Sequence, residues 1–260
     1  MDWYRMKTIL IFLFLGINLF LAALLGYESY AMHRTAKAQT ESAIATLGRS
    51  GITVSAQTPI GGKRLRSLTL ENPCADKAAF TALLLGEGTE SAGDHYQKDG
   101  KSLRFTENGF SYIGTSSPAP CEKKHIASMK KVLENMGFSM RYAKGTIENG
   151  AVVFTQIVDK VPLFGSSLRV TPASDGSVSK IEGTWANVLD AVGEKSRTSG
   201  AAKALLAFLQ EGTHQGKTIT GIQCGYAVLL SGDGYRTADA VPTWRIETAD
   251  GSTAFYDARQ

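Results

Sequence analysis

The sequence lacks most motifs that would mark an enzyme. It contains no HExxH, no GxSxG, no CxxC and no phosphate-binding glycine loop, which excludes the usual signatures of zinc proteases, serine hydrolases, dithiol redox proteins and P-loop proteins. The four histidines are scattered and none stands at zinc-ligand spacing: His33, His95, His125 and His214. Nothing in the sequence therefore supports an enzyme, a metal centre, a cofactor or a small-molecule substrate.

Clusters of one charge and low-complexity tracts are missing as well. The net charge is only +4, and the composition of 43% hydrophobic and 20% charged residues is that of a folded protein. A nucleic-acid-binding protein would need a basic stripe with stacking aromatics on one element, and the chain has none. We therefore expect a folded protein that does not bind nucleic acid.

Cysteine is scarce, and its odd number leaves at least one thiol unpaired. A disulfide between Cys74 and Cys121 would suit an exported domain, but free Cys residues usually behave as small core residues, and we favour free thiols. Cys121 and His125 are four residues apart, as a nucleophile and base on one helical face would be. Because Cys121 directly follows Pro120, we place it in a loop, and an enzyme centred on it remains only an alternative.

One long apolar run is present. Residues Thr8 to Tyr27 are uncharged and mostly apolar, and no comparable run follows. A helix of this length rises about 30 Å, the thickness of the hydrocarbon core of a bilayer. We expect a short cytoplasmic tail at 1–7, a transmembrane helix at 8–27 and a water-soluble body.

A cleaved signal peptide is the rival interpretation of this run. Signal peptides have apolar cores of roughly 7–15 residues, and the core here is longer, although Ser29–Ala31 resembles a cleavage site. Arg5 and Lys7 favour a cytoplasmic N-terminus, while Arg34 and Lys37 on the far side weaken the bias. We expect the helix to remain and the body to be extracytoplasmic.

Turn dipeptides and alternating segments predict a body rich in antiparallel strands. Asn-Gly or Asp-Gly pairs occur at 99–100, 108–109, 149–150, 175–176, 233–234 and 250–251. Strand patterns flank most of them, at 102–107, 110–114, 151–159, 168–171, 178–182, 244–248 and 253–258. Apolar helical stripes followed by glycine cover 31–47, 76–85, 123–136 and 199–210. Helices laid on antiparallel sheets bury both apolar surfaces, so the predicted class is α+β.

Two segments of the sequence are similar to each other, which suggests an internal repeat. A Val-Pro pair leads through a strand to Asp175-Gly176-Ser177, and a second Val-Pro pair leads to Asp250-Gly251-Ser252, each after an amphipathic helix. The pattern predicts two helix-plus-strands units, at about 120–190 and 198–260. With a proline-rich turn at 114–120, it favours a membrane-proximal helix and first α+β domain at 28–117 and a second α+β domain at 118–260.

The predicted membrane helix carries a candidate partner-binding stripe. Asn18, Ala22 and Gly26 are spaced by four and fall close to one helical face. Small residues at this spacing allow two helices to approach closely, and a membrane asparagine can hydrogen-bond to a neighbouring helix. Chance is the competing explanation, since alanine and glycine are frequent in membrane helices.

The sequence also resembles a known family. Its opening and several strand segments are similar to the YycI (WalI) family, regulatory proteins of an essential cell-wall two-component system in Gram-positive bacteria. The matching segments are Met1–Trp3, Arg5, Lys7–Ile11, Phe14–Leu21, Val161–Phe164, Ser167–Val170, Pro242–Ile246 and Phe255–Ala258, the last two also similar to PepSY-like modules. The cysteines match no pattern of the family.

The resemblance implies a single-pass membrane protein with an extracytoplasmic body. It further implies that the body and the membrane helix contact the sensor histidine kinase WalK and the related YycH protein, with Asn18, Ala22 and Gly26 facing their membrane helices. An exported PepSY-like inhibitor or chaperone that binds a protease or peptide is the alternative.

Overall fold

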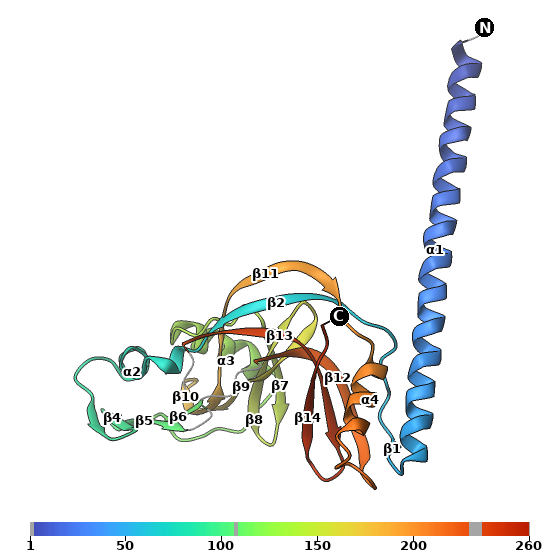
Figure 1. Cartoon of the computed structure of the whole chain (residues 1–260). Helices are drawn as coiled ribbons and strands as arrows, with labels where there is room; N and C mark the ends of the chain where they lie inside the picture. The colour runs from blue at the N-terminus through green and yellow to red at the C-terminus, as the bar shows by residue number, and fades with distance from the viewer. Residues whose placement is uncertain (1–2, 107–108, 229–235, 260) are drawn as a thin grey trace. The chain divides into compact units, whose positions relative to one another are not determined.

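The computed structural model describes residues 3–106, 109–228 and 236–259 (Figure 1). The helices are α1 (Trp3–Arg49), the 3-10 turn η1 (Pro73–Ala75), α2 (Lys77–Leu85), α3 (Lys124–Asn135) and α4 (Ala201–Gln210). The strands are β1 (Thr53–Val54), β2 (Arg64–Glu71), β3 (Glu90–Ala92), β4 (His95–Lys98), β5 (Lys101–Thr106), β6 (Gly109–Ile113), β7 (Ala143–Glu148), β8 (Ala151–Val158), β9 (Val161–Pro172), β10 (Val178–Thr184), β11 (Asn187–Arg197), β12 (Thr218–Val228), β13 (Thr237–Thr248) and β14 (Thr253–Asp257). The predicted α+β class is confirmed.

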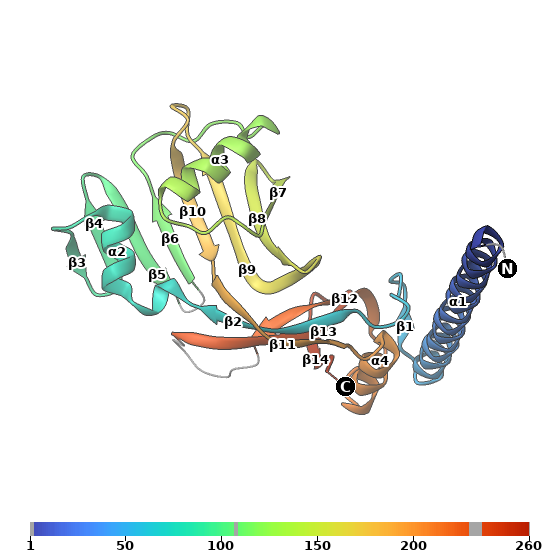
Figure 2. The ribbon, with the colours of Figure 1, turned by 90° about the horizontal axis from the view of Figure 1, so that it is seen from above.

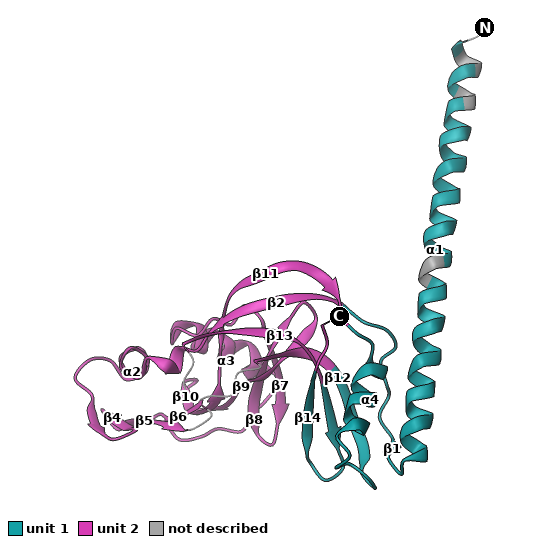
Figure 3. Ribbon diagram, viewed as in Figure 1, with its two compact units in different colours: residues 1–63, 199–223, 245–256 teal, residues 64–198, 224–244, 257–260 magenta. Residues whose placement is uncertain are grey.

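The chain forms two compact units, and each combines several segments (Figure 3). Unit 1 contains residues 1–63, 199–223 and 245–256, and unit 2 contains residues 64–198, 224–244 and 257–260. The domain limits and the PepSY-like repeat stay predictions.

A run of eight antiparallel strands dominates unit 2. Its order is β7-β8-β9-β10-β6-β5-β4-β3, and β2 separately pairs with β11 and with the first residues of β13. Helix α3 lies across β7, β8 and β9, while α2 lies against β4 and β5 (Figure 2). Both helices turn their apolar stripes to the sheet, because that removes the two apolar surfaces from water together.

The core of unit 2 fills the space between these helices and strands. Phe80 of α2 packs against Phe105, Phe110 and Phe138, with ring centroids 4.8–6.1 Å apart. Met129 and Leu133 of α3 are fully buried in the same cluster. The helical stripes predicted at 76–85 and 123–136 are therefore core-packing faces.

Unit 1 combines a small sheet with α4 and the second half of α1. The β1-β12-β13-β14 strands are neighbours, and α4 lies beside the second half of α1 (Figure 1). Leu47 of α1, Leu205 and Phe208 of α4 and Ile219 of β12 are buried. The membrane helix and the membrane-proximal helix predicted from the sequence are one continuous helix that ends in this core.

Two of the predicted turns have the positive φ angles at both residues that their dipeptides favour. Asp99-Gly100 and Asn149-Gly150 both have positive φ angles and join β4 to β5 and β7 to β8. The pair at 233–234 lies outside the described residues, and so does Asn108 of the pair at 108–109. The β8–β9 turn at Asp159-Lys160 has φ angles of 49° and 65° without a glycine, so no dipeptide signalled it.

The two Asp-Gly turns of the similar segments, at 175–176 and 250–251, share one hydrogen-bond pattern. The Asp175 carboxylate accepts hydrogen bonds from the backbone N–H and hydroxyl of Ser177, and Asp250 does so from Ser252. These bonds stabilise the ionised carboxylates. The pKa of Asp175 falls to about 2, mainly because of the hydrogen bond that it accepts from the Ser116 hydroxyl. The pKa of Asp250 falls further, mainly because of the hydrogen bond that it accepts from the Thr248 hydroxyl.

Three buried hydrogen bonds form a ring that fixes Ala186, in the link between β10 and β11. The Gln156 amide donates to the Ala186 carbonyl at 2.8 Å, the Ser166 hydroxyl donates to the Gln156 carbonyl oxygen, and the Ala186 N–H donates to the Ser166 hydroxyl at 3.2 Å. Gln156 is 1% exposed and Ser166 is 4% exposed. Because each polar group in the ring has a partner, burial carries no unpaired donor or acceptor.

Replacing the amide should destabilise the fold. Gln156→Leu keeps a similar volume but leaves the Ala186 carbonyl and the Ser166 hydroxyl short of a partner, so we expect the free energy of unfolding to fall by about 1–3 kcal/mol. Urea unfolding of the detergent-solubilised protein measures this. The exposed Gln97→Leu is the matched control and should change stability by less than about 0.5 kcal/mol. Equal effects of both variants would contradict the role of the ring.

The glycine-free β8–β9 turn offers a stabilising substitution. Lys160 adopts a left-handed conformation that glycine accepts without steric cost, so Lys160→Gly should raise the free energy of unfolding by about 0.5–1 kcal/mol. The same substitution at Lys144, in the extended strand β7, should lower it. Thermal unfolding of both variants measures the difference, and destabilisation by Lys160→Gly would refute the explanation.

Candidate functional site

The first half of α1 presents apolar side chains to its surroundings. Phe12, Phe14 and Phe20 are 65–70% exposed, and the other large apolar residues between Leu10 and Tyr27 are exposed as well. Among the described residues, α1 is the one helix long and apolar enough to cross a membrane. A water-soluble protein does not leave such a surface uncovered. The helix is therefore consistent with a single-pass membrane protein.

All three predicted partner-binding residues lie on this exposed part of α1. Asn18, Ala22 and Gly26 follow one another at four-residue spacing on the described helix, so they share a face. The Asn18 amide donates one hydrogen bond to the Phe14 carbonyl of its own helix at 2.8 Å. A β-carbon added at Gly26 would meet no atom within 4 Å, so this glycine is not required by packing within the chain.

The second half of α1 anchors the helix in unit 1. Thr40, Ala43 and Leu47 are buried, and α4 is the helix that they face. The helix ends where the Ile52 N–H donates to the Leu47 carbonyl, and β1 follows at once. The exposed apolar half and the packed half thus belong to one continuous helix.

The cysteines are not arranged for catalysis. Cys74 and Cys121 are free thiols, Cys121 lies in the loop before α3, and the His125 ring accepts a hydrogen bond from the Glu122 backbone N–H at 2.8 Å. Burial raises the pKa of Cys74 to about 12, and burial, with a smaller contribution from the Glu122 charge, raises the pKa of Cys121. A reactive thiol needs the opposite shift. Within the described residues, no three His, Cys, Asp or Glu side chains group as metal ligands.

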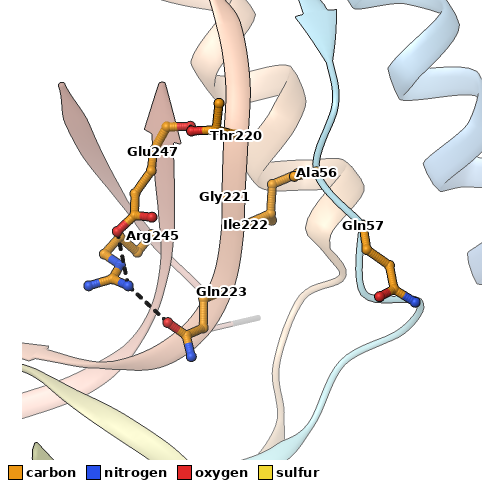
Figure 4. Close-up of a pocket in the computed structure, with 8 residues that line it drawn as sticks. All are labelled: Ala56, Gln57, Thr220, Gly221, Ile222, Gln223, Arg245 and Glu247. Atoms are coloured by element: carbon orange, nitrogen blue, oxygen red, sulfur yellow. Dashed lines mark hydrogen bonds and ion pairs between the residues drawn. The ribbon is translucent and has the colours of Figure 1, made fainter. Parts of the chain in front are cut away.

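Unit 1 also contains a polar cavity of about 300 Å³ that the sequence did not predict (Figure 4). Ala56 and Gln57, just after β1, form one wall, and the opposite wall comes from β12 and β13: Thr220, Gly221, Ile222, Gln223, Arg245 and Glu247. The Arg245 guanidinium bonds both the Gln223 amide oxygen and the Glu247 carboxylate at 3.0 Å. The sequence signal that could have drawn attention here is Gly221, a glycine inside a strand.

These features define a class of protein: a chain with one membrane-spanning helix that continues into an α+β body. The sequence model described as YycI protein matches residues 32–259. The chain therefore belongs to the YycI family, which is a family of two-component-system regulators.

Other comparisons add little. No protein of curated function matches the chain. The crystal structure at 1.45 Å resolution of an uncharacterized protein from Eubacterium rectale ATCC 33656 is similar at 10% identity and a TM-score of 0.43, covering 81% of this chain and 89% of that one.

The raised thiol pKa values predict slow alkylation. Because only the thiolate attacks, iodoacetamide at neutral pH should modify Cys74 and Cys121 more slowly than free glutathione, and their rates should still be rising above pH 9. Mass spectrometry of the intact native protein identifies the modified positions, with urea-unfolded protein as the control for full reactivity. Selective fast modification of Cys121 would revive the enzyme interpretation.

Proposed function

We propose that the protein is a membrane-anchored regulator of a cell-wall two-component system in a Gram-positive cell. Its N-terminus lies in the cytoplasm and its body outside, and it acts by contact with a WalK-like sensor histidine kinase and a YycH-like co-regulator. Membership of the YycI family is the single observation that supports this proposal most strongly. The exposed apolar helix agrees with it.

In this proposal the face of Asn18, Ala22 and Gly26 packs against a partner's membrane helix. Each position is exposed along α1, and Gly26 leaves room for close approach. The Asn18 amide carries a second hydrogen and a carbonyl oxygen besides the group bonded to Phe14, so it can still bond across an interface. Signals then pass between membrane and body through the continuous α1 helix.

Photocrosslinking in native membranes tests the partner. A photoreactive residue at position 22 should capture a histidine kinase or a second single-pass regulator, which mass spectrometry identifies. The same residue at position 20, on the opposite side of the helix, is the matched control and should capture mainly lipid. Recovery of the protein only as a shortened secreted form would overturn the proposal in favour of a signal peptide.

Substitutions on the stripe should weaken the association without unfolding the body. Asn18→Leu removes a membrane hydrogen bond worth about 0.6 kcal/mol, so we expect partner affinity to fall about threefold. Gly26→Leu should weaken it further, since the side chain fills the space left for close helix packing. Energy transfer between labelled helices in membranes measures affinity, and Phe20→Leu is the control. Unchanged affinity in both stripe variants would exclude this face.

A further inference from the structure

The edge of β12 next to β1 is only partly paired. Strand β1 has two residues, with Thr53 opposite Thr218 and Val54 opposite Ile219 in parallel register. The ladder then ends at the Ile219 carbonyl, which accepts hydrogen bonds from the N–H groups of both Ser55 and Ala56, at 3.0 and 3.3 Å. After Ala56 the chain leaves the edge.

The polar cavity lies where this pairing stops. Ile219 directs its backbone groups to β1, and backbone direction alternates along a strand, so Gly221 and Gln223 direct theirs to the same side. Strand β9 pairs with β12 at Tyr226, opposite Leu163. Between Ile219 and that point, no described strand of unit 1 pairs with Gly221 or Gln223 on this side, and both residues line the cavity (Figure 4). The cavity therefore offers backbone donors and acceptors of a sheet edge.

The side chains around the cavity favour a neutral backbone over an ion. The Arg245 guanidinium is already balanced by the Glu247 carboxylate at 3.0 Å, so the cavity carries no excess charge. A β-carbon at Gly221 would stand 2.6 Å from the Glu247 carboxylate. Because Gly221 has no side chain, the Glu247 side chain can lie against β12 at this point. Residues 221–223 span about 10 Å, the length of three extended residues.

The edge strand β11 is protected against such pairing. Strand β11 in unit 2 has two interruptions of its register with β2, and Gly193, which lies within the second, adopts a positive φ angle. Its Lys195 forms an ion pair with Asp159 at 2.8 Å. Irregular, charged edges of this kind discourage strand addition. The β12 edge at Gly221–Gln223 has a cavity beside it instead.

We propose that this cavity binds an extended peptide segment of a partner protein, which adds to β12 as a short strand in line with β1. Backbone hydrogen bonds to Gly221 and Gln223 supply the affinity, and Ala56 and Ile222 provide the apolar contact for one side chain. This proposal does not depend on which protein binds the membrane helix. Failure of the proposed kinase partnership would therefore leave the peptide site unaffected, and the reverse also holds.

The test uses the full chain in detergent micelles and a capped pentapeptide, acetyl-Thr-Val-Thr-Val-Thr-amide, whose residues alternate as in β1. Amide NMR should show the Gly221 and Gln223 signals moving on titration to millimolar peptide. Two further peptides carry N-methyl groups on residues 2 and 4 or on residues 3 and 5. One of them should bind about tenfold more weakly and the other should bind almost normally, because alternate N–H groups face β12.

A variant pair tests the position. Ala56→Trp fills the cavity from the segment after β1 and should abolish binding, whereas Thr53→Trp, on an exposed position outside the cavity, should leave it intact. The dispersion of the remaining amide signals shows whether each variant is folded. Absence of binding, or equal weakening by both methylated peptides, overturns the proposal even if Ala56→Trp fails to fold, because those measurements use the unaltered protein.

Discussion

The apolar surface of α1 between Leu10 and Tyr27 is the constraint from which the rest of the structure follows. Its side chains are exposed along the whole segment, and water penalises such a surface by about 25 cal/mol for every Å². A bilayer removes that penalty and fixes where the chain operates. Since α1 continues without interruption into unit 1, the apolar segment and the folded body are joined by a helix and not by a loop.

The two halves of α1 have different surroundings, although they form one helix. Residues 27–47 contain neither glycine nor proline, so nothing in the sequence breaks or kinks the connection. The first half matches lipid, while Ala43 and Leu47 match the apolar face of α4. In the proposed function this continuity matters, because a displacement of the first half of α1 would reach a packed core through a helix and not through a loop.

Local features of the fold were predictable, and long-range ones were not. Helical stripes such as 123–136 and dipeptides such as Asn149-Gly150 determine structure over a few residues, so the sequence alone located them. The shared face of Asn18, Ala22 and Gly26 also follows from helical spacing, while their role in partner binding stays a prediction. The cavity depends on pairing between Thr53 and Thr218, far apart in the chain, and periodicity within a segment contains no information about that partner. The Asp159-Lys160 turn was missed because it has no glycine.

The segmented composition of unit 1 has a consequence for biosynthesis. Its first segment ends at residue 63, yet the helix and strands that cover it belong to residues 199–223 and 245–256. During synthesis, Leu47 and Ile52 therefore emerge long before Leu205 and Ile219 exist to bury them. Unit 1 closes only when nearly the whole chain has been synthesised, so a chain interrupted after Thr198 contains the apolar helix but lacks this core.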